Sequence, residues 1–193
     1  MKADNSNIGP KLLVRRHFLR EFHRDDPARV LDCFAGEGVL WRILRSEFNV
    51  DSYVGIDQKR KRGLIAADSL RILRAGKYTE NVIDLDAYGS PWEHFDQVVK
   101  KCHHSVTVFL TYGFRNVSAV MPISACAIPK ILSEAAGLNR FSVSVPPSLA
   151  TFAAPLAIRY FLGRASQTFN IKKAYQAEPH TNAFYYGVRL EKK

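Results

Sequence analysis

The sequence predicts a single α/β domain built on one mainly parallel sheet, closed by an antiparallel last strand. Short apolar segments alternate with helical patterns over residues 29–111. The segment 105–111 is β-branched and apolar throughout, as is typical of a buried parallel strand. Two longer strand patterns at the end are joined by the turn-rich residues 178–182. With 193 residues the chain suffices for one domain with a substantial core. We expect this domain over 11–193, after a mobile lead-in at 1–10.

The elements follow in order along the chain. The first predicted helix covers residues 11–24 and ends before Pro27, because the residue before a proline disfavours the α conformation. Strands are predicted at 29–33, 52–57, 81–85 and 105–111, and helices at 39–47, 68–75 and 92–101. Helices near 122–136 and 148–162 flank an alternating segment at 141–145. The strands 168–177 and 183–191 form the closing hairpin.

The charge balance favours a polyanionic partner. The net charge is +10 and the pI is about 9.7, which raises the local concentration of nucleic acid; a generically basic protein is the alternative. Basic residues line one side of the first predicted helix, and a basic run follows the strand at 52–57. This run could instead shape a cofactor pocket. The candidate phosphate contacts are Lys11, Arg15, Arg16, Lys59 and Arg60.

Other composition features argue against a membrane or metal protein. No apolar run approaches the roughly 20 residues that a membrane span needs, and the N-terminus lacks the apolar core of a signal peptide. Cys33, Cys102 and Cys126 lack metal-like spacing, and the six histidines form no metal-like cluster. We therefore expect a cytoplasmic protein without a metal.

The most informative stretch is the turn after the first predicted strand. The strand ends in Asp32, and glycines 36 and 38 precede the next helix. Glycine tolerates positive φ and lets a ligand approach the backbone, while the helix N-terminus offers free N–H groups. The third glycine of the dinucleotide motif is absent, as is the lysine-containing phosphate loop. The turn therefore indicates another nucleotide-like cofactor.

The pattern D-x-F-A-G-x-G over residues 32–38 resembles the first motif of class I S-adenosylmethionine-dependent methyltransferases. The resemblance implies a Rossmann-like seven-stranded sheet with a reversed final hairpin and S-adenosylmethionine as cofactor. In that family the turn and its acid hold the methionine part, a second acid binds the ribose, and a third binds the adenine amine. The alternative is that these acids only cap helices. The matching positions are Asp32, Phe34, Ala35, Gly36, Gly38, Asp57 and Asp68, with Gln58 beside the adenine.

A second resemblance follows the strand at 81–85. The segment Asp86-Ala87-Tyr88-Gly89-Ser90-Pro91 is similar to the acceptor motif of amino-directed nucleic-acid methyltransferases, in the form found in tRNA guanine-N2 dimethyltransferases. Ala87 replaces the first proline of that motif. The resemblance implies that Asp86 accepts an N–H of the target amine and that Tyr88 stacks on the base. The alternative is a simple strand-to-helix turn with Ser90 as N-cap.

Together these features predict a methyltransferase that acts on an exocyclic amine of a nucleic acid, with RNA favoured over DNA. Two alternatives stay open. The acceptor could be a protein or a small molecule, or the chain could be a non-catalytic nucleic-acid-binding module with the same fold. The alanine at position 87 favours the last alternative.

Overall fold

The computed structural model describes residues 8–87, 90–113, 121–122, 144–145, 157–177 and 183–193. The predicted helix near 122–136, like Tyr88, Gly89 and Cys126, lies outside these residues apart from its first position. Within the described part of the chain, no helix is long and apolar enough to cross a membrane.

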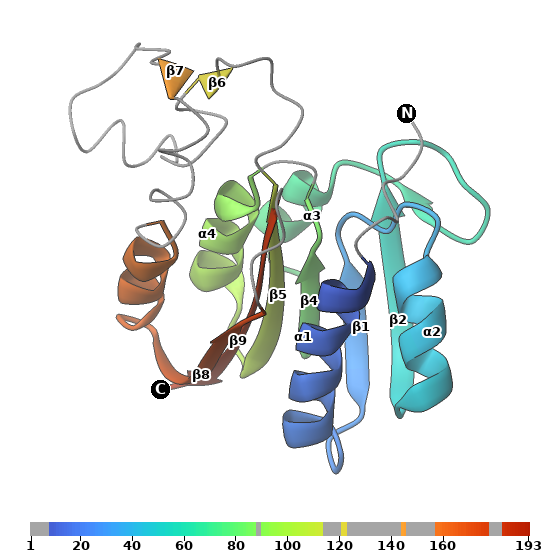
Figure 1. Cartoon of the computed structure of the whole chain (residues 1–193), viewed down its shortest axis with the longest axis horizontal. Helices are drawn as coiled ribbons and strands as arrows, with labels where there is room; N and C mark the ends of the chain where they lie inside the picture. Colours follow the sequence, from blue (N-terminus) through green and yellow to red (C-terminus); the bar gives the residue numbers. More distant parts are fainter. Residues whose placement is uncertain (1–7, 88–89, 114–120, 123–143, 146–156, 178–182) are drawn as a thin grey trace.

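A seven-stranded sheet forms the centre of the fold, in the order β3-β2-β1-β4-β5-β9-β8 (Figure 1). The first five strands of this order pair in parallel, and β9 runs antiparallel to both of its neighbours. The predicted α/β sheet with its antiparallel last strand is therefore confirmed. The strands are β1 (Ala28–Asp32), β2 (Val50–Asp57), β3 (Ile65–Ala66), β4 (Val82–Leu85), β5 (Val106–Gly113), β8 (Phe169–Gln176) and β9 (Ala183–Lys192). A separate pair consists of β6 (Met121–Pro122) and β7 (Ser144–Val145).

Helices cover both faces of the sheet. On one face, α1 (Ile8–Phe22) and α2 (Val39–Glu47) bury an apolar cluster that contains Phe18, Trp41 and Phe109 (Figure 1). On the other face, α3 (Ser69–Ala75), α4 (Trp92–Lys101) and a helix over 157–165 bury a second cluster that contains Trp92 and Phe161. Both faces are covered, so the central strands read as continuous apolar runs.

The N-terminal helix packs unusually close to the sheet. Gly187 of β9 lies under Phe18, and a Cβ atom at position 187 would come within 2.5 Å of the Phe18 ring. Glycine is needed there because no larger residue leaves room for the ring. This approach holds α1 against β9 and β5, with Lys11 and Arg15 at the end of β4.

Several predicted boundaries are corrected. Helix α1 begins at Ile8 rather than at position 11, so the last three residues of the predicted lead-in are helical; Pro10 fits because a proline is tolerated in the first helical turn. Strand β3 was not predicted, since two residues are too short for a periodic pattern. By contrast, α4 agrees with the prediction at both ends.

Candidate active site

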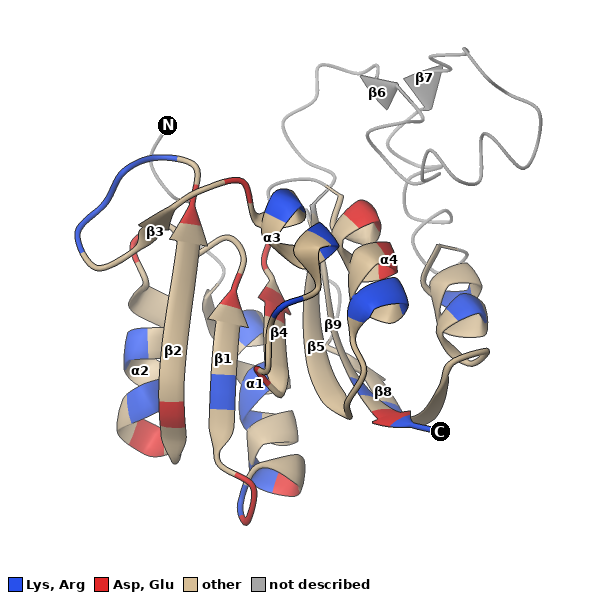
Figure 2. Ribbon diagram, turned by 180° about the vertical axis from the view of Figure 1, so that it is seen from behind, with Lys and Arg blue, Asp and Glu red and all other residues tan. Residues whose placement is uncertain are grey.

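Acidic side chains gather where three neighbouring strands end. Strand β1 pairs with β2 and β4 in parallel, so that Asp32 lies in register with Gly55 and with Asp84. Asp57 is the last residue of β2, and Asp86 follows β4 directly. Figure 2 shows acidic positions in red at the ends of β1, β2 and β4, at one edge of the sheet. In open α/β sheets, ligands bind outside this carboxyl edge.

The glycine turn has the backbone geometry expected from the sequence. Gly36 and Gly38 have φ values of 55° and 65°, in the left-handed region that favours glycine. The Ala35 N–H donates to the Ile56 carbonyl at 2.9 Å, which ties the turn to β2. Gly38 is the N-cap of α2 and supplies no side-chain acceptor to its first turn. The N–H groups of that turn are therefore available to a ligand.

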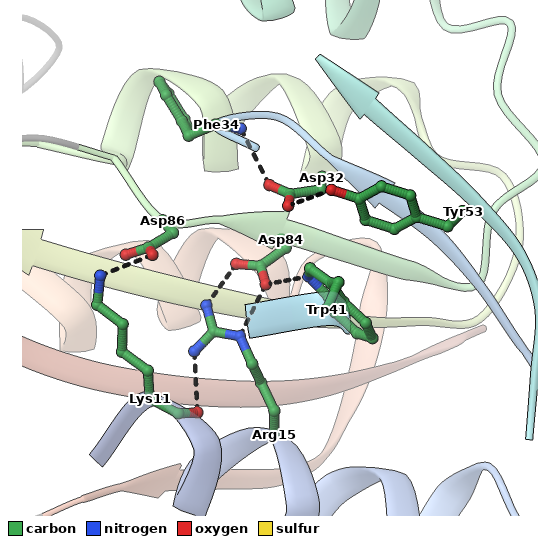
Figure 3. A network of polar contacts seen from close by, with 8 residues as sticks. All are labelled: Lys11, Arg15, Asp32, Phe34, Trp41, Tyr53, Asp84 and Asp86. Atoms are coloured by element: carbon green, nitrogen blue, oxygen red, sulfur yellow. Dashed lines mark hydrogen bonds and ion pairs between the residues drawn. The ribbon is translucent and has the colours of Figure 1, made fainter. Parts of the chain in front are cut away.

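Asp32 is held beneath this turn. Its carboxylate accepts hydrogen bonds from the Phe34 N–H at 3.2 Å and from the Tyr53 hydroxyl at 3.0 Å (Figure 3). Burial, and then the nearby Asp84, raise the pKa of Asp32 well above its ordinary value. No cation of the described residues pairs directly with Asp32, so a positively charged ligand group would stabilise its ionised form.

The raised pKa of Asp32 makes a prediction for the variant Asp32→Asn. A carboxyl whose pKa is higher in the folded chain stabilises the fold below its unfolded pKa, near 4, and loses that contribution as the pH rises through the folded pKa. We therefore expect the unfolding free energy of wild type, relative to Asp32→Asn, to fall by up to about 1.4 kcal/mol per pH unit in that window. Urea unfolding at several pH values measures this slope. The exposed residue Asp51 provides the control Asp51→Asn; a pH-independent difference for Asp32→Asn would contradict the prediction.

Asp57 stays ionised at the end of β2. Its carboxylate accepts from the Lys59 N–H at 2.8 Å and pairs with the Lys61 ammonium at 3.2 Å. Burial opposes ionisation, but these two contacts outweigh it and lower the pKa of Asp57. Lys61 also reaches Glu37 of the glycine turn at 3.3 Å. Lys61 therefore connects the turn to Asp57, whereas Gln58, Lys59 and Arg60 are exposed.

Asp68 caps a helix, which is the alternative to a role in binding adenine. It is the N-cap of α3, and its carboxylate accepts from the Leu70 N–H at 2.9 Å. Its role toward adenine stays a prediction. The adjoining Ser69 hydroxyl lies 3.1 Å from Nε2 of His94, whose ring packs 4.8 Å from the Phe34 ring. His94 thus connects the start of α3 to the glycine turn, and burial lowers its pKa.

The acids of β4 meet the basic side of α1. The Arg15 guanidinium donates to both oxygens of Asp84, at 2.7 and 2.5 Å, and Trp41 donates to the same carboxylate at 2.7 Å (Figure 3). The Lys11 ammonium lies 2.7 Å from Oδ2 of Asp86. Asp84 is fully buried. A buried carboxylate requires such partners, because an unpaired charge in the interior is costly.

Three predicted phosphate contacts therefore have other partners. For Arg15 the prediction is wrong, because its side chain is only 1% exposed. Lys11 is committed to Asp86, and Arg16 makes two hydrogen bonds to Glu47 at 2.6 and 2.7 Å. Lys59 and Arg60 lie in the exposed basic loop drawn in blue beyond β2 in Figure 2. Their contact with a nucleic acid stays a prediction.

Sequence reasoning missed the partners of these acids. Trp41, Tyr53 and His94 lie outside the recognised motifs, whereas Lys61 belongs to the basic run that the sequence placed beside the cofactor pocket. One signal was present: Asp84 and Asp86 are two positions apart at the end of an apolar strand, and therefore point to the same side of the sheet. Acids on a sheet face that a helix covers need buried cations as partners. Two basic residues four positions apart lie on the same side of a helix and can supply these cations.

The acceptor motif is only partly described. Ala87 is buried, and Tyr88 lies outside the described residues. Pro91, not Ser90, is the N-cap of α4, so the alternative capping role of Ser90 is wrong. Among the described residues no group of three His, Cys, Asp or Glu could hold a metal, and Cys33 and Cys102 are buried free thiols.

Comparison with known proteins gives a structural likeness and no sequence match. No protein-family model matches the chain, and no curated protein matches it significantly. Trm1 from Pyrococcus horikoshii, solved with S-adenosyl-L-methionine, matches with a TM-score of 0.63 and 14% identity over 96% of this chain and 54% of Trm1. This chain therefore spans about half the length of Trm1.

Two further solved structures match more weakly. The PH0226 protein from Pyrococcus horikoshii OT3 has a TM-score of 0.47 and 13% identity, over 96% of this chain and 94% of that protein. The N-methyltransferase NodS from Bradyrhizobium japonicum WM9, solved with S-adenosyl-L-homocysteine, has a TM-score of 0.46 and 9% identity over 92% and 84%. At these sequence identities a structural match shows a shared fold and nothing more. The conclusion about the fold rests on the match with Trm1.

Proposed function

We propose that this chain, whose fold is that of the class I S-adenosylmethionine-dependent methyltransferases, transfers a methyl group from that cofactor to an exocyclic amine of a nucleic acid. One observation supports the proposal above all others. The glycine turn, Asp57 and Asp86 lie at the carboxyl edge of three neighbouring parallel strands, where such sheets bind their ligands.

The polar groups of this edge suit the cofactor. S-adenosylmethionine carries an ammonium group, a ribose with two neighbouring hydroxyls, and an adenine. Asp32 can stabilise the ammonium, because the carboxyl is buried and no cation of the described residues pairs directly with it. Asp57 can accept from the ribose hydroxyls while it remains paired with Lys61, since a carboxylate has about four lone-pair sites. Asp68 and Gln58 stay the candidates for the adenine end.

The chemistry requires an acceptor for the amine. An exocyclic amine is a weak nucleophile, because its lone pair is delocalised into the base. Asp86 can accept one N–H, which turns the lone pair toward the methyl group, and it can take the proton as positive charge develops on nitrogen. The N–C bond forms as the C–S bond breaks, and S-adenosylhomocysteine leaves. Tyr88 would stack on the base, and alignment of the three reacting atoms supplies much of the acceleration.

Exposed arginines on the α1–α2 face support a nucleic-acid substrate. Arg20 packs over the Phe48 ring at 5.8 Å and Arg45 over the Tyr53 ring at 5.6 Å, so both cations stay on the surface. Arg42 and Arg45 also line a hollow of about 470 Å³ between α2 and β2. These arginines replace Lys11 and Arg15 as candidate phosphate contacts. Lys59 and Arg60 remain candidates as well. A basic surface of this kind agrees with the net charge of +10.

A direct experiment tests the proposal. Calorimetry should detect binding of S-adenosylmethionine, and tritiated cofactor should label total RNA more than DNA or protein. RNA affinity should fall at least about tenfold between 50 and 200 mM salt, because several phosphate contacts release counterions. Absence of cofactor binding would refute the enzyme. Label in the protein fraction alone, or salt-independent RNA binding, would refute the nucleic-acid substrate.

A non-catalytic nucleic-acid-binding module is the second candidate. Two observations favour it: Ala87 stands in place of the motif's proline, and Lys11 already contacts the carboxylate that should accept the amine. This candidate predicts salt-sensitive RNA binding without methyl transfer. Transfer to any RNA above the background of the Asp86→Asn variant would exclude it.

A further inference from the structure

The ion pair between Lys11 and Asp86 is the unexpected feature of the candidate site. It joins residues 75 positions apart, with the Lys11 nitrogen 2.7 Å from Oδ2 of Asp86. The two side chains are only 16% and 20% exposed. Solvent and salt screen such an enclosed pair much less than a surface pair. Its influence on the Asp86 carboxylate is therefore strong.

Arg15 fixes the place of Lys11. The two residues lie one helical turn apart on α1, and the Arg15 guanidinium donates to the Lys11 carbonyl at 3.0 Å while it holds Asp84 with its other nitrogens (Figure 3). This buried fork sets the position of α1 along its axis. Lys11 is thereby brought beside Asp86 by the fold, not by a flexible surface contact.

Lys11 is the cation that most favours the anionic form of Asp86. Three carboxyls, Asp32, Asp84 and Asp86, face two cations, Lys11 and Arg15. Burial and Asp84 raise the pKa of Asp32 and so favour its protonated form. Burial also opposes the ionisation of Asp86, but Lys11, Arg15 and then the Thr111 hydroxyl of β5 lower the pKa of that carboxyl.

We propose that Lys11 is a positioning residue for the acceptor carboxylate: it holds Oδ2 of Asp86, keeps the group anionic, and fixes the orientation in which the carboxylate meets the substrate amine. Oδ1 is buried, and no described residue lies in hydrogen-bonding geometry with it; the Thr111 hydroxyl acts on the carboxylate without meeting that geometry. With one oxygen committed, the carboxylate has a single orientation, which a nucleophile with a directional lone pair requires. This inference rests on the proposed methyl transfer.

The test compares Lys11→Met, which removes the cation, with Lys11→Arg, which retains it. Lys173→Met is the matched control, because Lys173 pairs with Glu21 near the opposite end of α1. Methyl transfer to total RNA is measured from pH 9 down through the acidic limb of its pH profile, together with S-adenosylmethionine affinity. Independently of activity, ¹³C NMR follows the titration of the Asp86 carboxyl, which is assigned by its absence in Asp86→Asn.

In Lys11→Met we expect the acidic limb of transfer and the NMR titration of Asp86 to move up together by at least about one pH unit. On the acidic limb, transfer by Lys11→Met should then fall about tenfold relative to wild type at the same pH. Cofactor affinity should stay within about twofold, because Lys11 makes no proposed contact with the cofactor. The loss of even one hydrogen bond to the cofactor would change the affinity by more than that. Lys11→Arg and Lys173→Met should keep the wild-type profile.

Two results would overturn the inference: an unchanged Asp86 titration in Lys11→Met, or an equal loss of transfer at every pH. If wild type transfers no methyl group, the proposed function fails, but the NMR titration still decides whether Lys11 controls Asp86.

Discussion

Replacing Arg15 by methionine should lower the free energy of unfolding by about 3–5 kcal/mol. The change removes the cation from the fully buried Asp84, which among the described residues then keeps the Trp41 indole as its hydrogen-bond partner. A loss of that size is a large part of the roughly 5–15 kcal/mol that stabilises a typical domain. Urea unfolding followed by far-UV circular dichroism measures it, because the signal does not depend on the fluorescence of Trp41.

The double variant Arg15→Met with Asp84→Asn is the control for this prediction. It removes both charges, and the asparagine oxygen can still accept from Trp41, so most of the lost stability should return. Arg16→Met, which breaks the exposed pair with Glu47, should cost no more than about 1 kcal/mol. If Arg15→Met cost as little as Arg16→Met, the account of a buried anchor for α1 would be wrong.

Replacing Asp86 by asparagine should lower methyl transfer by about 10²–10⁴-fold and leave S-adenosylmethionine affinity nearly unchanged. Asparagine keeps the shape of the side chain but loses the charge that accepts the amine proton. Transfer of tritiated methyl groups and calorimetry measure the two quantities. The unfolding free energy is recorded as well, because the variant leaves Lys11 without its carboxylate.

Asp57→Ala provides the opposite pattern. It removes the acceptor of the ribose hydroxyls, so cofactor affinity should fall at least about tenfold, as expected for a lost hydrogen bond to a charged group. Transfer at saturating cofactor should be reduced much less. Equal effects of Asp57→Ala and Asp86→Asn on binding and transfer would refute the division of roles between the two acids.

Local sequence signals were sufficient for most of the sheet and for the turn at its edge. The β-branched segment before Gly113 and the alternating final hairpin became β5, β8 and β9 near the predicted positions. Gly36 and Gly38 adopt the positive φ that their motif requires. These features can be predicted from the sequence, because the spacing of apolar residues and the conformation of a glycine depend on residues nearby in the chain.

The basic side of α1 was the main error in the site. Lys11 and Arg15 lie four residues apart and read as a surface stripe, because the sequence alone does not show which side of an amphipathic helix faces acids from another element. Packing of Phe18 on Gly187 brings that stripe to the ends of β4. The cations therefore satisfy buried carboxylates.

The order of residues in this chain thus suffices to infer the α/β sheet, the glycine turn and the acids at the strand ends, since each depends on short-range pattern. The partners of those acids follow only from the packing of α1 and α2 on the sheet. Ion pairs such as Lys11 with Asp86 and Arg15 with Asp84 join residues 75 and 69 positions apart. Their formation depends on where α1 and α2 pack on the sheet. The local pattern of residues does not determine that packing.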